Sequence, residues 1–279
     1  MEILRKGNRS GKKWLRMVVL VLLIALAGAG ANTGHVTALA AKSAAVKNGW
    51  SKDKNYYYKD GKKVTGLYKI GKKTYYFGTK GKLVRERRAL LIKVKGKKYY
   101  YNIDTKGVAK KWTGTAQLAA KRLVALKANL NTVTEKKMEK SLKKAFLWAA
   151  DLKYRDNTVS KTGNAALNYY GTYAFTMKSG DCNTQACAFY WMAKVLGYKP
   201  KYVRGYVPVG SEFKPHAWVE IPIDGVTYVF DPNFNTTYDE RFKSTFREAF
   251  GKYAGFKFRY GEHNTYTYYL QPGGEQIEK

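Results

Sequence analysis

The spacing of apolar positions predicts three helices in the middle of the chain. Residues 116–128 show the pattern of a surface helix. Thr132 and Glu135 have the spacing of a capping box, so a second helix is expected to begin there and to run through Leu152. A third apolar run with helical spacing covers residues 183–196. The stripe expected to be buried on the second helix consists of Met138, Leu142, Ala145, Phe146 and Ala149.

Alternating apolar and polar positions replace the helical period after residue 200 and predict antiparallel strands. Strands are expected over residues 201–207, 216–221 and 226–230. The last two are joined by Asp224 and Gly225, a strong signal for a two-residue hairpin turn. Helices that precede antiparallel strands are typical of an α+β fold and not of a doubly wound one.

The expected hairpin fixes which residues face one another. If the two-residue turn closes it, Ile223 lies opposite Val226, and further along Trp218 lies opposite Asp231. His216 precedes Trp218 by two residues and therefore projects from the same face as Asp231, as its diagonal neighbour. This register predicts that a carboxylate orients an imidazole.

Residues 41–113 follow a different pattern, rich in lysine, tyrosine and glycine. An aromatic triplet recurs at intervals of about twenty residues, which marks a repeat architecture. The triplets occupy residues 56–58, 75–77 and 99–101, and glycine turns follow at Gly61, Gly81 and Gly107. Each unit is too small to bury its own aromatic side chains, so the units are expected to stack as hairpins in a short β-solenoid.

The N-terminus has the features of a secretory signal peptide. A basic stretch precedes an apolar run over residues 17–27 and then small residues, with cleavage expected near residue 40. An uncleaved membrane anchor is the competing interpretation. Tyrosine-rich residues 256–270 predict one or two further strands. The expected division is a signal peptide at 1–40, repeats at 41–113, a catalytic domain at 114–270 and a frayed tail at 271–279.

Charge is distributed unevenly along the chain. More than half of the formal net charge of +32 lies in residues 41–115. A field of that density attracts polyanions. For an exported protein we expect an anionic cell-wall polymer as the partner. Nucleic acid is a weaker choice because no nucleic-acid motif is present, and a merely soluble basic spacer is the plain alternative.

The two cysteines differ in their expected roles. Cys182 lies at the predicted start of the third helix, where unpaired backbone N–H groups and the helix dipole favour the thiolate. Cys187 lies roughly 140° further around the helix and fits a buried apolar position. A disulfide between them is not expected, and the cysteines and histidines have no zinc-ligand spacing. His263, in a predicted turn, is a weak rival to His216 as a base.

These segments together resemble the transglutaminase-like superfamily of papain-fold thiol enzymes. The resemblance covers residues 113–270 and rests on the order Cys182, His216 and Asp231. The supporting motifs are residues 180–186, KYVRGYV at 201–207, HAWVE at 216–220 and YVFDP at 228–232. It implies that Cys182 is the nucleophile, His216 the general base and acid, and Asp231 the carboxylate that fixes the tautomer, with no cofactor or metal. The side chain that helps to bind the oxyanion is left open among Tyr169, Tyr170 and Tyr173.

The repeats resemble the cell-wall-binding repeats of Gram-positive surface proteins, the family that includes choline-binding repeats. Candidate wall-polymer contacts are Trp50, Tyr57, Tyr68, Tyr76 and Tyr100. Choline itself is not expected, because the lysines around the tyrosines repel a quaternary ammonium.

The sequence thus predicts a secreted, cell-wall-associated thiol enzyme without stable membrane insertion after cleavage of the signal peptide. It is expected to form an acyl-enzyme from peptide or protein amides, as a peptidase or a protein-glutamine transamidase. Hydrolysis is favoured because the positive catalytic segment disfavours cationic lysine acceptors. The alternative is a catalytically inactive transglutaminase-like protein that only binds at a surface.

Overall fold

The structure is a computed structural model that describes residues 47–131, 135–209, 212–233 and 276–277. The predicted signal peptide, Thr132, residues 256–270 and His263 lie outside these residues. Among the residues that are described, no helix is long and apolar enough to cross a membrane.

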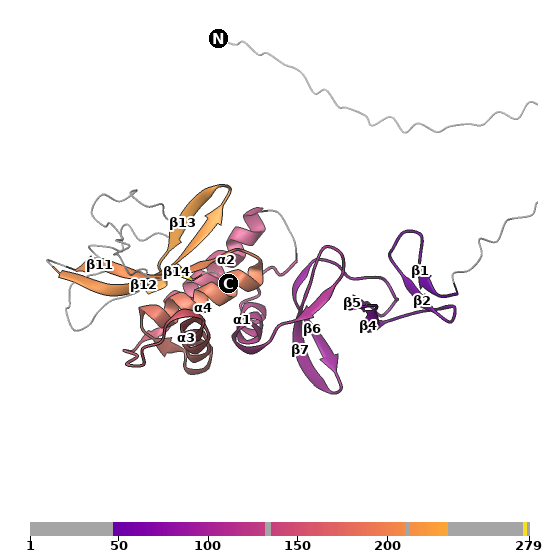
Figure 1. Ribbon diagram of the computed structural model, residues 1–279, viewed down its shortest axis with the longest axis horizontal. Coiled ribbons are helices and arrows are strands. Elements are labelled where there is room, and N and C mark those ends of the chain that lie inside the picture. Colours follow the sequence, from indigo (N-terminus) through magenta and orange to yellow (C-terminus); the bar gives the residue numbers. More distant parts are fainter. Residues whose placement is uncertain (1–46, 132–134, 210–211, 234–275, 278–279) are drawn as a thin grey trace, which may run out of the picture. The chain divides into compact units, whose positions relative to one another are not determined.

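The repeat region consists of three small antiparallel sheets in succession (Figure 1). The first contains β1 (Gly49–Trp50), β2 (Tyr57–Lys59) and β3 (Lys62–Lys63), the second β4 (Gly66–Ile70) and β5 (Lys73–Phe77), and the third β6 (Arg87–Val94), β7 (Lys97–Ile103) and β8 (Ala109–Lys111). Side chains from neighbouring sheets share apolar clusters. For example, Leu67 and Tyr76 of the second sheet pack against Ile92 and Tyr101 of the third. The prediction of stacked hairpins is confirmed.

The turn glycines of the repeats have the conformation that their position requires. Gly61, Gly81 and Gly107 have φ angles of 74°, 75° and 83°, which L side chains rarely adopt. A Cβ atom at Gly107 would also lie 2.8 Å from the side chain of Leu83. Glycine therefore permits both the turn and the close packing of adjacent units.

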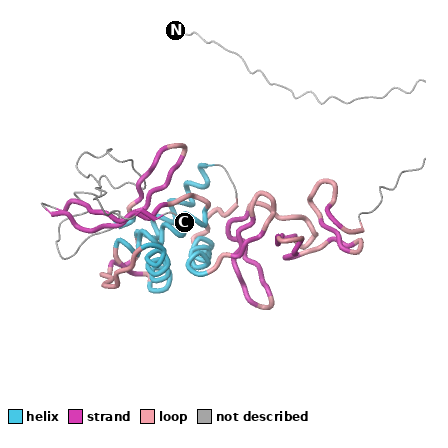
Figure 2. The backbone as a smooth tube through the Cα atoms, in the orientation of Figure 1, coloured by secondary structure: helices cyan, strands magenta, loops and turns pink. Residues whose placement is uncertain are grey.

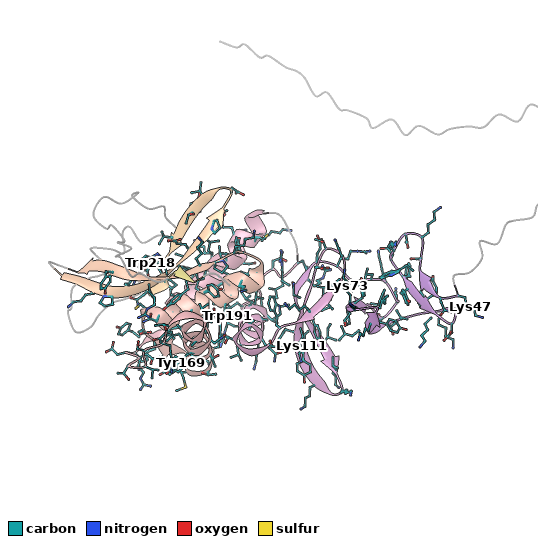
Figure 3. The ribbon with its side chains drawn as sticks, viewed as in Figure 1. Lys47, Lys73, Lys111, Tyr169, Trp191 and Trp218 are labelled. Atoms are coloured by element: carbon teal, nitrogen blue, oxygen red, sulfur yellow. The ribbon has the colours of Figure 1, made fainter. Side chains whose placement is uncertain are left out.

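Helices build much of the core of residues 114–233, as the cyan tubes of Figure 2 show. They are α1 (Gly114–Ala125), α2 (Glu135–Ala150), α3 (Gly163–Met177) and α4 (Cys182–Leu196). Helices α1, α2 and α3 all pack against α4, which is buried over most of its length. Trp191 of α4 donates a hydrogen bond to the carbonyl of Leu167 on α3 at 2.8 Å (Figure 3).

An antiparallel sheet with the strand order β13-β12-β11-β14 accompanies the helices. Its strands are β11 (Lys201–Val209), β12 (Glu212–Ile223), β13 (Val226–Phe230) and β14 (Gln276–Ile277). Phe230 of β13 packs against Phe189 of α4, with ring centroids 5.1 Å apart. The expected α+β fold is confirmed.

Several elements agree with the predicted pattern and others differ. Ile223 pairs with Val226 and Val219 with Phe230, so the predicted hairpin register is confirmed. In the predicted stripe of α2, Leu142, Ala145, Phe146 and Ala149 are buried, whereas Met138 is half-buried. Helix α3 was not predicted. Residues 276–277, within the segment predicted as a tail, form β14. The β14 strand pairs with Tyr202 and Val203 through its backbone, which requires no apolar periodicity.

Candidate active site

The loop before α4 places Cys182 at the N-terminus of a buried helix. Asp181 is the N-cap, and its carboxylate accepts hydrogen bonds from the backbone N–H and the hydroxyl of Thr184 at 3.0 and 2.8 Å. A side chain at position 180 would collide with Thr184, so Gly180 is required for this tight approach. Cys182 is the first residue of the helix and is half-buried, so reagents can reach it at a point where the helix dipole favours an anion.

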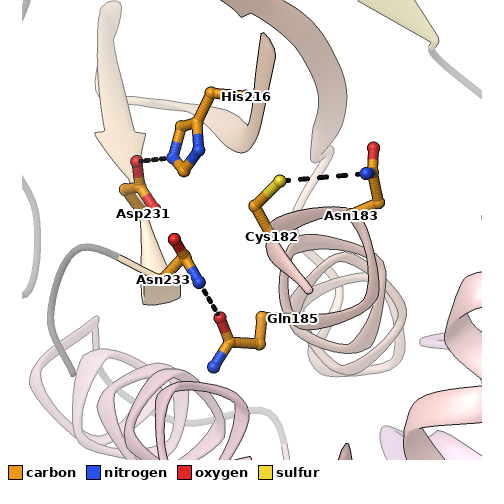
Figure 4. Close-up of polar contacts among 6 residues, drawn as sticks. All are labelled: Cys182, Asn183, Gln185, His216, Asp231 and Asn233. Atoms are coloured by element: carbon orange, nitrogen blue, oxygen red, sulfur yellow. Dashed lines mark hydrogen bonds and ion pairs between the residues drawn. The ribbon is translucent and has the colours of Figure 1, made fainter. Parts of the chain in front are cut away.

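His216 and Asp231 meet beside Cys182, as the hairpin register predicted. The Nε2 atom of His216 on β12 lies 2.6 Å from Oδ2 of Asp231, which follows β13, and both side chains are buried. The fully buried Trp218 stacks on the imidazole, with ring centroids 6.3 Å apart. Figure 4 shows that the other ring nitrogen, Nδ1, lies on the edge of the imidazole that is directed towards the Cys182 sulfur. The structure therefore brings the three predicted residues together.

The environment of His216 favours the imidazolium form. Burial is the largest single influence and lowers the pKa, but the charge and hydrogen bond of Asp231, helped by Cys182, outweigh it and raise the pKa to about 10. The stabilisation from this interaction is fully present below the ordinary value of 6.5 and is lost as the pH rises through about 10. At neutral pH His216 is thus protonated and can form an ion pair with a thiolate.

Cys187 has none of these features. It is fully buried in the helical core, and burial raises the pKa of its thiol well above the ordinary value. Both cysteines are free thiols. The difference in exposure between Cys182 and Cys187 matches the expectation that the second is an apolar core residue.

A pair of side-chain amides connects the site to the helices. Asn233 donates a hydrogen bond of 2.6 Å to Oε1 of Gln185 on α4 (Figure 4). The Nε2 group of Gln185 in turn lies 3.2 and 3.3 Å from the carbonyls of Ala150 and Leu152. Gln185 therefore links the end of α2 and α4 to the segment that carries Asp231.

The three tyrosines left open as oxyanion donors make other contacts, whereas a fourth, Tyr154, interacts electrostatically with Cys182. The hydroxyl of Tyr170 donates to the carbonyl of Val159 at 2.7 Å, while Tyr169 and Tyr173 pack against one another. Tyr154 pairs with Gly180, two residues before the nucleophile. Burial, Asp156, and the charges of Cys182 and Asp181 together raise its pKa.

A short pair of strands positions Tyr154 beside the segment that precedes Cys182. It belongs to β9 (Lys153–Tyr154), which pairs in parallel with β10 (Ser179–Gly180) immediately before α4. A two-residue strand has no periodicity that a sequence pattern could reveal.

The candidate wall-binding residues occupy three different environments. Trp50, Tyr57 and Tyr68 form one aromatic cluster, with successive ring centroids 5.4 and 5.7 Å apart. Tyr76 lines a cavity of about 500 Å³ together with Lys93 and Lys95, among others. Tyr100 instead packs against the helical core and does not join the others.

Residues 124–232, which include Cys182, His216 and Asp231, match the family model described as the Transglutaminase-like superfamily. This part of the chain is a transglutaminase-like domain. Among curated proteins, none matches the chain.

Three solved structures are similar to parts of the chain. The choline-binding domain of Spr1274 from Streptococcus pneumoniae shares 26% identity over 24% of this chain and 97% of its own length, with a TM-score of 0.19. A candidate cysteine protease from Cytophaga hutchinsonii shares 18% identity over 43% of this chain, with a TM-score of 0.32. A TGase shares 14% identity over 48% of this chain, with a TM-score of 0.31. The chain spans only 39% and 37% of the length of the last two proteins.

Proposed function

We propose that the protein is a secreted, cell-wall-associated thiol enzyme that forms an acyl-enzyme at Cys182 from peptide or protein amides. The observation that carries this proposal is the position of His216, which is held by Asp231 at 2.6 Å on one side and faces Cys182 on the other. The match of residues 124–232 to the transglutaminase-like family supports a thiol enzyme.

The geometry supports the following reaction. The Cys182 thiolate attacks the carbonyl carbon of the amide, and the bond between that carbon and the leaving nitrogen breaks as protonated His216 gives its proton to the amine. The thioester that results is attacked by water or by a second amine, and His216 accepts the proton that the attacking group releases. Asp231 stays ionised and keeps the imidazole oriented.

The tetrahedral intermediate carries a negative charge on the former carbonyl oxygen. The backbone N–H of Cys182, at the open end of α4, is one donor for this oxygen. The Tyr154 hydroxyl is the second donor that we assign, because Tyr154 pairs with Gly180, two residues before the nucleophile. The hydroxyl donates to Asp156 at 2.9 Å when no substrate is bound.

We favour water as the acceptor that resolves the thioester, because the positively charged chain disfavours the approach of a cationic lysine. Incubation with a library of glutamine-containing peptides, with and without a primary-amine probe, distinguishes the two reactions. We expect peptide cleavage or deamidation at similar rates in both samples. Efficient incorporation of the amine without cleavage would contradict the hydrolase preference. Two results together would instead favour a surface-binding protein without activity. These are that neither product forms, and that a Cys182→Ala variant keeps the cellular phenotype.

We assign residues 41–113 to wall binding and residues 114–270 to catalysis. Within the repeats, Lys63 lies over the Tyr56 ring at 3.9 Å and Lys111 over the Tyr99 ring at 4.6 Å. Because lysines already cover these faces, an added quaternary ammonium has little access to them. This supports an anionic wall polymer as the ligand in place of choline.

Wall binding by the repeats is expected to be sensitive to salt. Surface charges are screened within about 8 Å at physiological ionic strength, so the full chain is expected to elute from purified cell walls as salt is added. Choline is expected to leave the bound fraction unchanged. Co-sedimentation with walls across a salt series, with and without choline, measures both effects. Retention that ignores salt, or release by choline at constant ionic strength, would contradict the assignment.

A further inference from the structure

Asn183, the second residue of α4, presents its side-chain amide to the sulfur of the nucleophile. Its Nδ2 group lies 3.8 Å from Cys182 Sγ (Figure 4). The same group lies 3.1 Å from Oδ2 of Asp181. One amide group therefore contacts both the helix-capping carboxylate and the reacting atom.

The neighbours of Asn183 fix the orientation of the amide. Because the carboxylate of Asp181 can only accept hydrogen bonds, the NH₂ end must face it. The opposite end, Oδ1, accepts a hydrogen bond of 2.6 Å from the hydroxyl of Tyr202 on β11. Tyr202 is fully buried, so a reversed amide would leave its hydroxyl facing the NH₂ group and Asp181 facing an oxygen atom.

The amide of Asn183 lies between two groups at the helix N-terminus that repel each other when both are negatively charged, Asp181 and the Cys182 thiolate. Asp181 caps the helix but also places a negative charge next to the residue that must become a thiolate. Since the two N–H groups of Asn183 point to the carboxylate and to the sulfur, the amide can solvate both charges at once.

We propose that Asn183 is a further catalytic residue, whose amide donates to the Cys182 thiolate, and that Tyr202 is the positioning residue that aims this amide. The proposal rests on the proposed function, in which Cys182 is the nucleophile. It predicts that the reactivity of the sulfur depends on a side chain of α4 and on a tyrosine of the sheet, in addition to His216 and Asp231.

The test is the rate at which iodoacetamide alkylates Cys182 in the intact protein between pH 5 and pH 10, followed by mass spectrometry. The titratable groups around the sulfur are His216 on β12, Tyr154 on β9, Tyr202 on β11, and Asp181 and Cys187 at the N-cap and in the body of α4. All of them are retained in Asn183→Ala, which also favours helix formation. Alkylation of this variant at pH 7 is expected to be about tenfold slower than in the wild type, the effect of losing one hydrogen bond to a charged group. Asn183→Asp adds a second carboxylate and is expected to be slower still.

Tyr202→Phe removes only the hydroxyl that aims the amide and is expected to slow alkylation by about twofold to fivefold. Tyr170→Phe is the matched control, because it also removes a buried tyrosine hydroxyl with a hydrogen bond, that to Val159. It is expected to leave the alkylation rate unchanged. Labelling of the buried Cys187 reports any unfolding in all variants.

Alkylation of Asn183→Ala and Tyr202→Phe at the wild-type rate across the pH range would overturn the proposal. If only the melting temperature falls in these variants, the network is structural. Failure of this proposal can be distinguished from failure of the proposed function. A wild type that reacts with no amide, together with slower alkylation of Asn183→Ala, would contradict the enzyme assignment and leave only the donation of the Asn183 amide to the thiolate.

Discussion

Replacement of Cys182 by alanine is expected to abolish acyl transfer, with a loss of at least about 10⁴-fold, because no other group in the site can form the thioester. Cys182 is half-buried at the end of a helix, so its removal leaves no cavity in the core and the fold should persist. The rate of product formation from the most reactive library peptide, followed by mass spectrometry, measures the effect.

Cys187→Ala is the matched control for this experiment. It removes the other thiol of the same helix, from a position that is fully buried and whose raised pKa keeps it protonated. This variant is expected to lose some stability and to keep its activity within about twofold, because the thiol of Cys187 is fully buried and cannot reach a substrate. Loss of activity in the Cys187 variant and its retention in the Cys182 variant would reverse the assignment of the nucleophile.

Replacement of Asp231 by asparagine is expected to lower the rate of acylation by about 10³- to 10⁴-fold, in the range known for the orienting carboxylate of a catalytic triad. The amide has the size of the carboxylate but no charge. Without the charge of residue 231, nothing offsets the effect of burial on His216. The pKa of His216 should therefore fall from about 10 towards or below the ordinary 6.5. At neutral pH the imidazole becomes neutral, and the ion pair with Cys182 is lost.

The same substitution changes how stability depends on pH. In the wild type the stabilisation from charged His216 is fully present below pH 6.5 and disappears as the pH rises through about 10. Asp231→Asn should lose this dependence, which melting temperatures between pH 6 and pH 10 will detect. Asp224→Asn is the control, since it neutralises an exposed carboxylate in the turn of the same hairpin. A wild-type melting temperature that is constant over this range, or an identical profile in Asp231→Asn, would contradict the ion pair.

The sequence predicted the central geometry of the site because that geometry follows from short-range rules. The turn at Asp224 and Gly225 determines the pairing of β12 with β13, and the pairing determines that His216 and Asp231 share a face. Likewise, the apolar spacing over residues 183–196 predicted the helix that begins at Cys182. In both cases, residues close together in the sequence were sufficient to predict the position of a site residue.

Other parts of the site could not be predicted because they depend on contacts between distant segments. Helix α3 is rich in aromatic residues and is buried against α4, so it lacks a clear polar face. Tyr154 is brought to Cys182 by a parallel pair of two-residue strands. The role of Asn183 becomes visible only when Tyr202, from a strand that follows the helix, supplies its hydrogen bond.

The central claim is that Cys182 forms an acyl-enzyme with the help of His216. The most direct measurement is the reaction of the full chain with 4-nitrophenyl acetate, combining the burst of nitrophenolate with mass spectrometry of the acid-quenched protein. The account predicts a burst equal to the enzyme concentration and an acetyl group on Cys182 but not on Cys187, with a much slower burst in His216→Ala. Acetylation of both cysteines at equal rates, or a burst that is unchanged in His216→Ala, would contradict it.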